Sequence, residues 1–136
     1  MYLLDTNILS NALRQRPSPA LLLRMQEVPI AEQCTSSITV AELLFGAIRL
    51  GDGGTRLLRL IERVVLANFT VSSFDLDAAQ RYAELRTYLE SAGTTIGHAD
   101  IQIAAIALAT DCVLVTDNLR HFQRVPGLVI ENWLER

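Results

Sequence analysis

Two kinds of segment alternate along this chain, and their alternation restricts the fold more than any other feature of the sequence. Short apolar runs rich in β-branched residues are followed by longer segments in which apolar residues recur at helical spacing. Parallel strands need a long crossover between them, and a helix usually provides it. The pattern therefore predicts an α/β domain with a central, mainly parallel sheet of about five short strands flanked by helices.

The predicted elements follow one another along the whole chain. Strands are expected at residues 2–4, 34–38, 70–73, 112–116 and 129–130, and helices at 7–14, 19–26, 40–50, 55–66, 75–92, 99–109 and 119–123. The glycine-rich segment 51–54 is expected to form a flexible loop between two helices. The apolar surface of the helix at 55–66 is expected to pack in the core rather than to bind a partner. The length of 136 residues, half of them hydrophobic, fits one domain spanning 1–136.

Charge and cysteine content narrow the range of functions. The chain has 15 acidic and 12 basic residues, so it lacks the basic surplus of a general nucleic-acid or membrane-surface binder. All of the basic residues are arginine, which excludes mechanisms that need a Schiff-base or general-base lysine. Cys34 and Cys112 lie in apolar stretches and are expected to be buried and reduced. With neither a signal peptide nor a membrane-spanning segment in the sequence, we expect a cytoplasmic protein without a membrane partner.

Four acidic residues lie just after predicted strands or in the first turns of predicted helices, where they could come together. Asp5 follows the first strand directly, and Asp117 follows the fourth. Glu42 and Asp100 are each expected in the first turn of a helix. Because the carboxyl ends of parallel strands lie along one edge of a sheet, where ligands bind, these acids are expected to face one crevice.

Each acid also has a simpler interpretation as a helix-capping residue. Asp, Thr and Asn are preferred at helix starts, and the segment from Thr39 to Glu42 matches the capping-box pattern S/T-x-x-E. Four acids on one edge would, however, repel one another unless cations neutralised them. Mg²⁺ or Mn²⁺ suits such a cluster, and two ions would suit phosphodiester hydrolysis. Zinc fits less well, because the cysteines lack paired spacing and His98 and His121 are expected to have surface or capping roles.

Four short motifs in this order resemble the PIN-domain ribonucleases, and among them the VapC-type toxins of bacterial toxin–antitoxin pairs. The motifs are Leu3-Leu4-Asp5-Thr6-Asn7, Ser37-Ile38-Thr39-Val40-Ala41-Glu42-Leu43 with Gly46, Ile96-Gly97-His98-Ala99-Asp100 before Ile103-Ala104-Ala105, and Val115-Thr116-Asp117-Asn118 before His121-Phe122. The Asn132-Trp133 ending is also similar to that family. The resemblance covers essentially the whole chain.

The resemblance implies a Mg²⁺-dependent endoribonuclease, with Mn²⁺ as a substitute ion. It implies that Asp5, Glu42 and Asp100 are metal-centre carboxylates, with Asp5 and Asp100 as metal ligands. Supporting roles in orienting these acids or a water are implied for Thr6 or Asn7 and for Thr116. Two alternatives remain open at the fourth position: either Asp117 is a catalytic acid of the centre, or Asn118 binds as a neutral oxygen or through water.

The resemblance also implies an RNA substrate, a homodimer and a cognate antitoxin that covers the crevice. Arginines whose planar guanidinium matches phosphate oxygens are candidates for binding the RNA, although each one taken alone is better explained as a solvated or salt-bridged surface residue. These candidates are Arg14, Arg16, Arg49, Arg86, Arg120 and Arg124. A ridge of three further arginines, at 56, 59 and 63, is expected to be a solvated face. The competing hypothesis is a catalytically inactive PIN-like module that binds RNA or protein.

Overall fold

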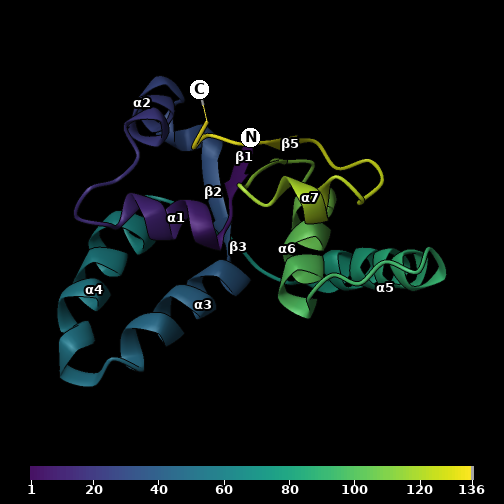
Figure 1. Ribbon diagram of the computed structural model, residues 1–136, viewed down its shortest axis with the longest axis horizontal. Helices are drawn as coiled ribbons and strands as arrows, with labels where there is room; N and C mark the ends of the chain where they lie inside the picture. Colours follow the sequence, from purple (N-terminus) through teal and green to yellow (C-terminus); the bar gives the residue numbers. More distant parts are fainter. Residues whose placement is uncertain (136) are drawn as a thin grey trace.

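The computed structural model describes residues 1–135, and in this part of the chain five parallel strands form one sheet with helices on both faces (Figure 1). The strands are β1 (Tyr2–Leu4), β2 (Gln33–Ser36), β3 (Thr70–Ser72), β4 (Val113–Val115) and β5 (Ile130–Glu131). Their order across the sheet is β3-β2-β1-β4-β5, and every neighbouring pair is parallel. The predicted α/β fold with a sheet of five short parallel strands is therefore confirmed.

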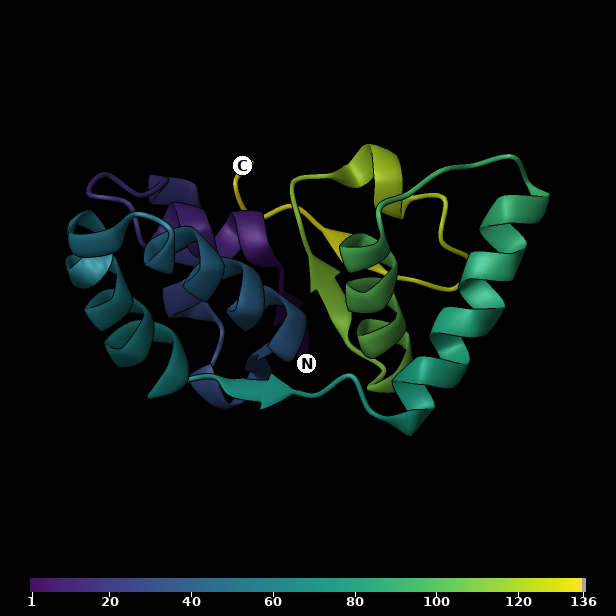
Figure 2. The same ribbon diagram turned by 90° about the horizontal axis from the view of Figure 1, so that it is seen from below.

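Two groups of helices cover the two faces of this sheet, as Figure 2 shows. One group comprises α1 (Thr6–Ala12), α2 (Pro19–Glu27), α3 (Ser37–Ile48) and α4 (Thr55–Leu60), and the other comprises α5 (Leu76–Ser91), α6 (His98–Ala109) and α7 (Leu119–Phe122). Successive strand residues point to opposite faces, so Leu3 joins the core beneath α5 and α6 while Leu4 joins the core beneath α1 to α4. Both faces of the central strand β1 are therefore buried, as is typical of parallel sheets.

The order of the strands determines where a ligand can bind. The chain runs outward from β1 to β2 and β3, and then returns to β4 on the other side of β1. The strand order therefore reverses between β1 and β4, which pair in register from Tyr2 with Val113 to Leu4 with Val115. In open α/β sheets, ligands bind outside the carboxyl ends of the strands at such a reversal. Asp5 and Thr116 are the first residues after these two strands.

Two local predictions are wrong. Residues 37 and 38 belong to α3 rather than to the strand before it, because the Ser36 side chain accepts a hydrogen bond from Thr39 N at 3.0 Å and caps the helix there. The segment Gly51–Gly54 is a 3₁₀ turn rather than a flexible loop. A side chain at Gly54 would collide with the backbone carbonyl of Ala47, so the turn is packed closely against the end of α3.

The apolar helix expected at 55–66 packs on the core, but only two of its apolar side chains are fully buried. It begins as α4 and continues as a π-helical segment, Ile61–Leu66, whose Ile61 and Val65 are fully buried against α1 and α3 neighbours such as Leu9 and Ala47. The two cysteines are buried and unbridged, with 3.9 Å between the Cys34 and Cys112 Sγ atoms. Within residues 1–135, no helix has both the length and the apolar character that crossing a membrane requires.

Candidate metal centre

Asp5 lies at the junction between β1 and α1, and its side chain is only 5% exposed. Its Oδ1 accepts a hydrogen bond from Ile8 N at 3.1 Å, so Asp5 caps α1. The capping interpretation is thus correct for this residue. It does not exclude a role in binding, because the cap engages one of the two carboxylate oxygens.

The surroundings of Asp5 make its negative charge costly. Burial raises the pKa of the Asp5 carboxyl from 3.8 to about 6, and hydrogen bonds from the Thr116 side chain and Ile8 N oppose this rise. The charges of Asp117 and Asp100 raise the pKa further. A divalent cation beside these three aspartates would remove both the repulsion and much of the desolvation cost.

The segment after β4 brings its polar residues to Asp5 and α1. Thr116 is fully buried, and its Oγ1 accepts a hydrogen bond from Asn118 N at 3.0 Å. Asp117 is exposed, and its Oδ1 accepts from Asn7 Nδ2 at 3.3 Å. Asn7 therefore connects the start of α1 to the acid that follows β4, across the reversal in strand order.

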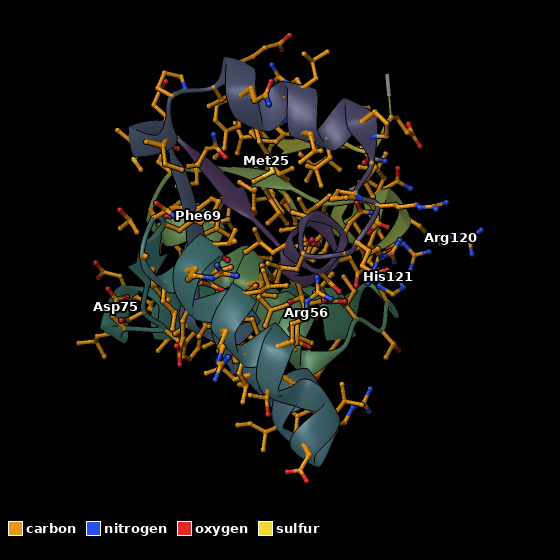
Figure 3. The ribbon with its side chains drawn as sticks, turned by 90° about the vertical axis from the view of Figure 1, so that its left-hand side faces the viewer. Met25, Arg56, Phe69, Asp75, Arg120 and His121 are labelled. Carbon is orange, nitrogen blue, oxygen red and sulfur yellow. The ribbon has the colours of Figure 1, made fainter. Side chains whose placement is uncertain are left out.

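Asp100 lies in the first turn of α6 and is partly exposed. His121 of α7 faces it, with 3.5 Å between His121 Nδ1 and Asp100 Oδ2 and 2.8 Å between the same nitrogen and Asn118 Nδ2. The two contacts are alternatives: a neutral Nδ1 accepts from the Asn118 amide, whereas a protonated Nδ1 is drawn to the Asp100 carboxylate. His121 and Arg120 project together on the side of the molecule opposite to Phe69 (Figure 3).

Sequence reasoning missed the involvement of His121, which it assigned to the surface or to capping. The side chain neither caps α7 nor stands alone. One signal in the sequence could have indicated its position: His121 follows Asn118 by three residues on a predicted helix, and side chains at that spacing lie on one helical face.

Glu42 reaches the site from α3. The capping-box prediction for Thr39 and Glu42 is wrong, since α3 starts two residues before Thr39 and has no acid in its first turn. Glu42 instead accepts a hydrogen bond from Thr6 Oγ1 at 2.7 Å. The charges of Asp117 and Asp100 both raise the pKa of Asp5. The candidate centre therefore has Asp5, Asp100 and Asp117 in electrostatic contact, with Glu42 connected to the start of α1 by its hydrogen bond from Thr6.

The six candidate RNA-binding arginines are all exposed, but their surroundings differ. Arg86 forms an ion pair with Glu90 at 3.1 Å and donates to Tyr82 Oη at 3.2 Å, so its guanidinium is already engaged. Arg14 and Arg49 line a pocket that also contains Glu42. The separate ridge of arginines on α4 and the segment after it is solvated, as predicted.

The chemistry of these donors fits Mg²⁺. Within residues 1–135, no arginine forms an ion pair with Asp5, Glu42, Asp100 or Asp117. In the same residues, no three His, Cys, Asp or Glu side chains converge closely enough to hold one ion by themselves. Mg²⁺ is commonly bound by one or two carboxylates, with water and substrate phosphates as the other ligands, so it needs no complete protein cage.

Comparison with known proteins shows the family to which this chain belongs. The family model described as PIN domain matches residues 2–128. The chain is 37% identical over 133 residues to ribonuclease VapC2 of Haemophilus influenzae, with 98% of each chain covered. It is 33% identical over 132 residues to the tRNA(fMet)-specific endonuclease VapC of Salmonella typhimurium, with 97% of each covered. The DNA-bound VapBC structure from Salmonella typhimurium has a chain that matches with a TM-score of 0.89 and 33% identity, over 97% of both chains. The chain therefore belongs to the PIN-domain family, and within it to the VapC-type ribonucleases, the toxins of toxin–antitoxin systems.

Proposed function

We propose that this ribonuclease is an endonuclease that hydrolyses RNA phosphodiesters with Mg²⁺, or with Mn²⁺ as a substitute, at the carboxyl edge of its sheet. In this proposal Asp5 and Asp100 hold the ion, and Glu42 and Asp117 complete the catalytic set. The observation that carries it is the buried Asp5, whose pKa is raised to about 6 by burial, next to two further aspartates. PIN-domain nucleases of the VapC type are typically metal dependent, which supports the need for a cation here.

The polar residues of the chain have distinct tasks in this mechanism. A bound Mg²⁺ would activate water for in-line attack on phosphorus and neutralise the developing charge. Hydrogen bonding from Thr116 lowers the pKa of Asp5 and so helps to keep it ionised. Asn7 holds Asp117, and Thr6 holds Glu42, so that both acids are oriented before substrate arrives. Such preorganisation contributes to catalysis because the groups need not rearrange in the transition state.

The partners of this reaction follow from the relatives. The similar Salmonella chain was solved as VapBC, which supports a cognate antitoxin that covers the acidic edge here. We also propose a homodimer and a cytoplasmic location, with residues 1–136 acting as one domain. One relative is named as specific for tRNA(fMet), which makes structured RNA a reasonable first substrate to test.

The decisive experiment measures RNA cleavage by purified, antitoxin-free protein in Mg²⁺ and in EDTA. Cleavage is expected in Mg²⁺ only, and Asp100→Asn is expected to reduce it by about a hundred-fold or more, since a metal ligand is lost. Asp111→Asn is the matched control, because Asp111 is exposed near the opposite edge of the sheet, before β4. Folded wild-type protein that cleaves no RNA in Mg²⁺ would contradict the proposal and favour the inactive binding module.

A paired substitution distinguishes Asp117 from Asn118 at the fourth position. Asp117→Ala is expected to lower cleavage at limiting Mg²⁺ by about ten-fold or more, because it removes a charge that acts directly on Asp5. Asn118→Ala is expected to have a smaller effect, since the Asn118 amide is occupied by His121. The measurement is the Mg²⁺ dependence of kcat/KM for both variants. A larger loss in Asn118→Ala would assign the fourth position to Asn118 instead.

A further inference from the structure

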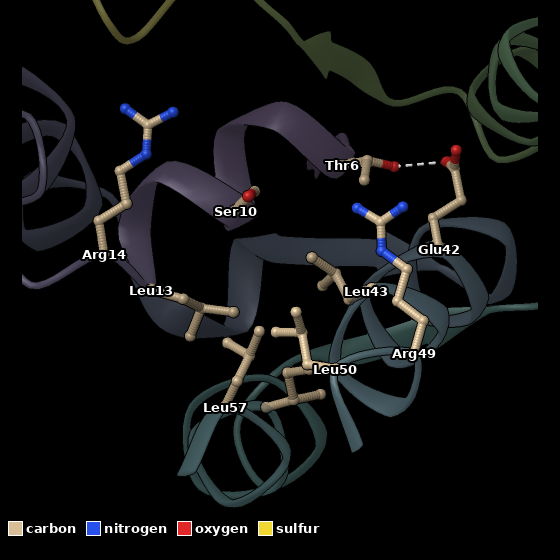
Figure 4. Close-up of a pocket in the computed structure, with 11 residues that line it drawn as sticks. Thr6, Ser10, Leu13, Arg14, Glu42, Leu43, Arg49, Leu50 and Leu57 are labelled. Atoms are coloured by element: carbon tan, nitrogen blue, oxygen red, sulfur yellow. Dashed lines mark hydrogen bonds between the residues drawn. The ribbon is translucent and has the colours of Figure 1, made fainter. Parts of the chain in front are cut away.

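A pocket of about 450 Å³ lies beside the acidic edge, between α1, α3 and the start of α4 (Figure 4). Its inner wall is apolar and includes Leu13, Leu43 and Leu57. At one end the pocket is bounded by Thr6 and Glu42, which are joined by their 2.7 Å hydrogen bond. The pocket therefore opens directly onto an acid of the candidate centre.

Gly46 forms part of the pocket wall from within α3. Glycine inside a helix is less stable than alanine, so its presence usually has a local reason. Close packing is not the reason, because a Cβ added at Gly46 would meet no atom within 4 Å. Because Gly46 has no side chain, the space beside it stays open and forms part of the pocket.

The mouth of the pocket carries positive charge. Arg14 lines it just after α1 and Arg49 just after α3, and Figure 4 shows the Arg49 guanidinium beside Thr6 and Glu42 and that of Arg14 at the opposite end of the pocket. Within residues 1–135, neither arginine forms an ion pair. The Arg49 Cζ lies 5.6 Å from the centre of the Phe45 ring, and this cation–π contact favours a defined position for the guanidinium.

We propose that this pocket binds one nucleotide of single-stranded RNA next to the phosphodiester that is cleaved, with the base against the apolar wall, one flanking phosphate at Arg49 and the next at Arg14. The inference rests on the proposed function and names a substrate subsite of the same site. An unpaired base combines flat apolar faces with polar edges, and the apolar wall with the Ser10 and Thr6 hydroxyls offers surfaces for both. The planar guanidinium groups match phosphate oxygens.

The position of Glu42 favours RNA over a protein segment as the molecule that binds in the pocket. The acid that bounds the pocket is part of the proposed catalytic set, so RNA bound for cleavage would lie next to this opening. The unpaired arginines at the rim complement an anionic backbone next to acids that a metal ion would neutralise. Charge and continuity with the catalytic edge thus favour a nucleotide.

The test fills the pocket from Gly46, and hydrolysis of a small diester reports whether Glu42, one helical turn before it, still functions. Gly46→Leu places a side chain in the open space, whereas Gly46→Ala adds a single methyl group and is expected to raise the thermal midpoint by a few degrees. The readout is equilibrium binding of a short, mixed-sequence, fluorescent single-stranded RNA in EDTA, where cleavage is not expected. Gly46→Leu is expected to weaken binding by about ten-fold or more and Gly46→Ala by much less.

Two further measurements separate this subsite from the catalytic centre. Arg49→Gln and Arg14→Gln are each expected to weaken RNA binding about three-fold or more, while Arg81→Gln on exposed α5 is expected to leave it unchanged. In Mg²⁺, Gly46→Leu is expected to lose RNA cleavage but to retain hydrolysis of the small diester bis(4-nitrophenyl) phosphate, which has no flanking nucleotide.

RNA binding that is unchanged in folded Gly46→Leu would overturn the subsite and leave the pocket to a protein partner. Failure of the wild type to hydrolyse either substrate would contradict the proposed function instead. The binding measurement in EDTA judges the subsite in both cases, because it does not depend on catalysis.

Discussion

Asp5→Asn is expected to abolish RNA cleavage and, at the same time, to stabilise the metal-free protein. In the proposed mechanism Asp5 holds the ion, so its loss would remove several kcal/mol of transition-state stabilisation, which corresponds to about a thousand-fold in rate. The fold should not suffer, because asparagine caps helices as well as aspartate does and can still accept from Ile8 N. The substitution also removes a buried negative charge that lies near Asp117 and Asp100.

The gain in stability should depend on pH in a defined way. The pKa of Asp5 rises from 3.8 to about 6 in the folded protein, so between these values the native state binds more protons than the unfolded state. The free energy of unfolding of the metal-free wild type therefore falls as pH rises through this range, by about 3 kcal/mol in total. The Asp5→Asn variant has no carboxyl to titrate at this position, so its free energy of unfolding should not fall over this range. It should therefore be as stable as the wild type near pH 4 and more stable above pH 7.

Urea unfolding in EDTA at acidic and at alkaline pH measures this difference. Added Mg²⁺ should stabilise the wild type above pH 7 but not Asp5→Asn, because ligand binding to the native state raises stability. Asp111→Asn should keep the stabilisation of the wild type by Mg²⁺, although asparagine suits the left-handed backbone at this position better and should itself raise stability slightly at every pH. The electrostatic account would be wrong if Asp5→Asn were less stable than the metal-free wild type at alkaline pH.

Trp133→Ala is expected to cause the largest loss of stability that a single side chain can produce here. Trp133 is only 2% exposed, and its ring centre lies 5.2 Å from that of Tyr2. Its Nε1 donates to Glu131 Oε1 at 3.0 Å, and the Arg24 guanidinium lies 5.0 Å from its ring centre. Truncation should leave a cavity and lower the free energy of unfolding by about 3–5 kcal/mol.

Trp133→Phe is the matched control for the hydrogen bond. It keeps an aromatic ring near Tyr2 and Arg24 and loses the indole N–H, while Glu131 Oε1 still accepts from Arg24 Nη2 at 3.1 Å. The expected cost is therefore only about 1–2 kcal/mol. Urea unfolding measures both variants, and a loss below about 1 kcal/mol in Trp133→Ala would show that this cluster does not hold the end of the chain in place.

The sheet could be predicted because its signal is local and repeated. Each strand is a short apolar run, and each crossover has the length and period of a helix, so the alternation restricts the strands to a mainly parallel arrangement. Once the sheet is parallel, Asp5 and Asp117 must share an edge, since Asp5 is the first residue after β1 and Asp117 the second after β4. These two positions depended only on where a strand ends, which the sequence marks clearly.

The position of Glu42 in its helix depended on whether Ser36 or Thr39 caps that helix, and the sequence does not decide between them. Both Ser36 and Thr39 can cap a helix, and the segment from Thr39 to Glu42 matches the capping box as well. In the structure Ser36 provides the cap, so α3 starts earlier than the pattern suggests. Glu42 then lies beyond the first turn, where it can accept from Thr6.

By itself, the sequence determined the class of fold, the edge at which the acids gather, and the resemblance that identifies the family, because all three depend on local order along the chain. Only the tertiary structure decided which side chains meet across elements. The pairing of His121 with Asp100, the raised pKa of Asp5 and the open space at Gly46 all arise between segments far apart in the sequence. Burial and distance between such segments are properties of packing, and no local pattern of residues encodes them separately.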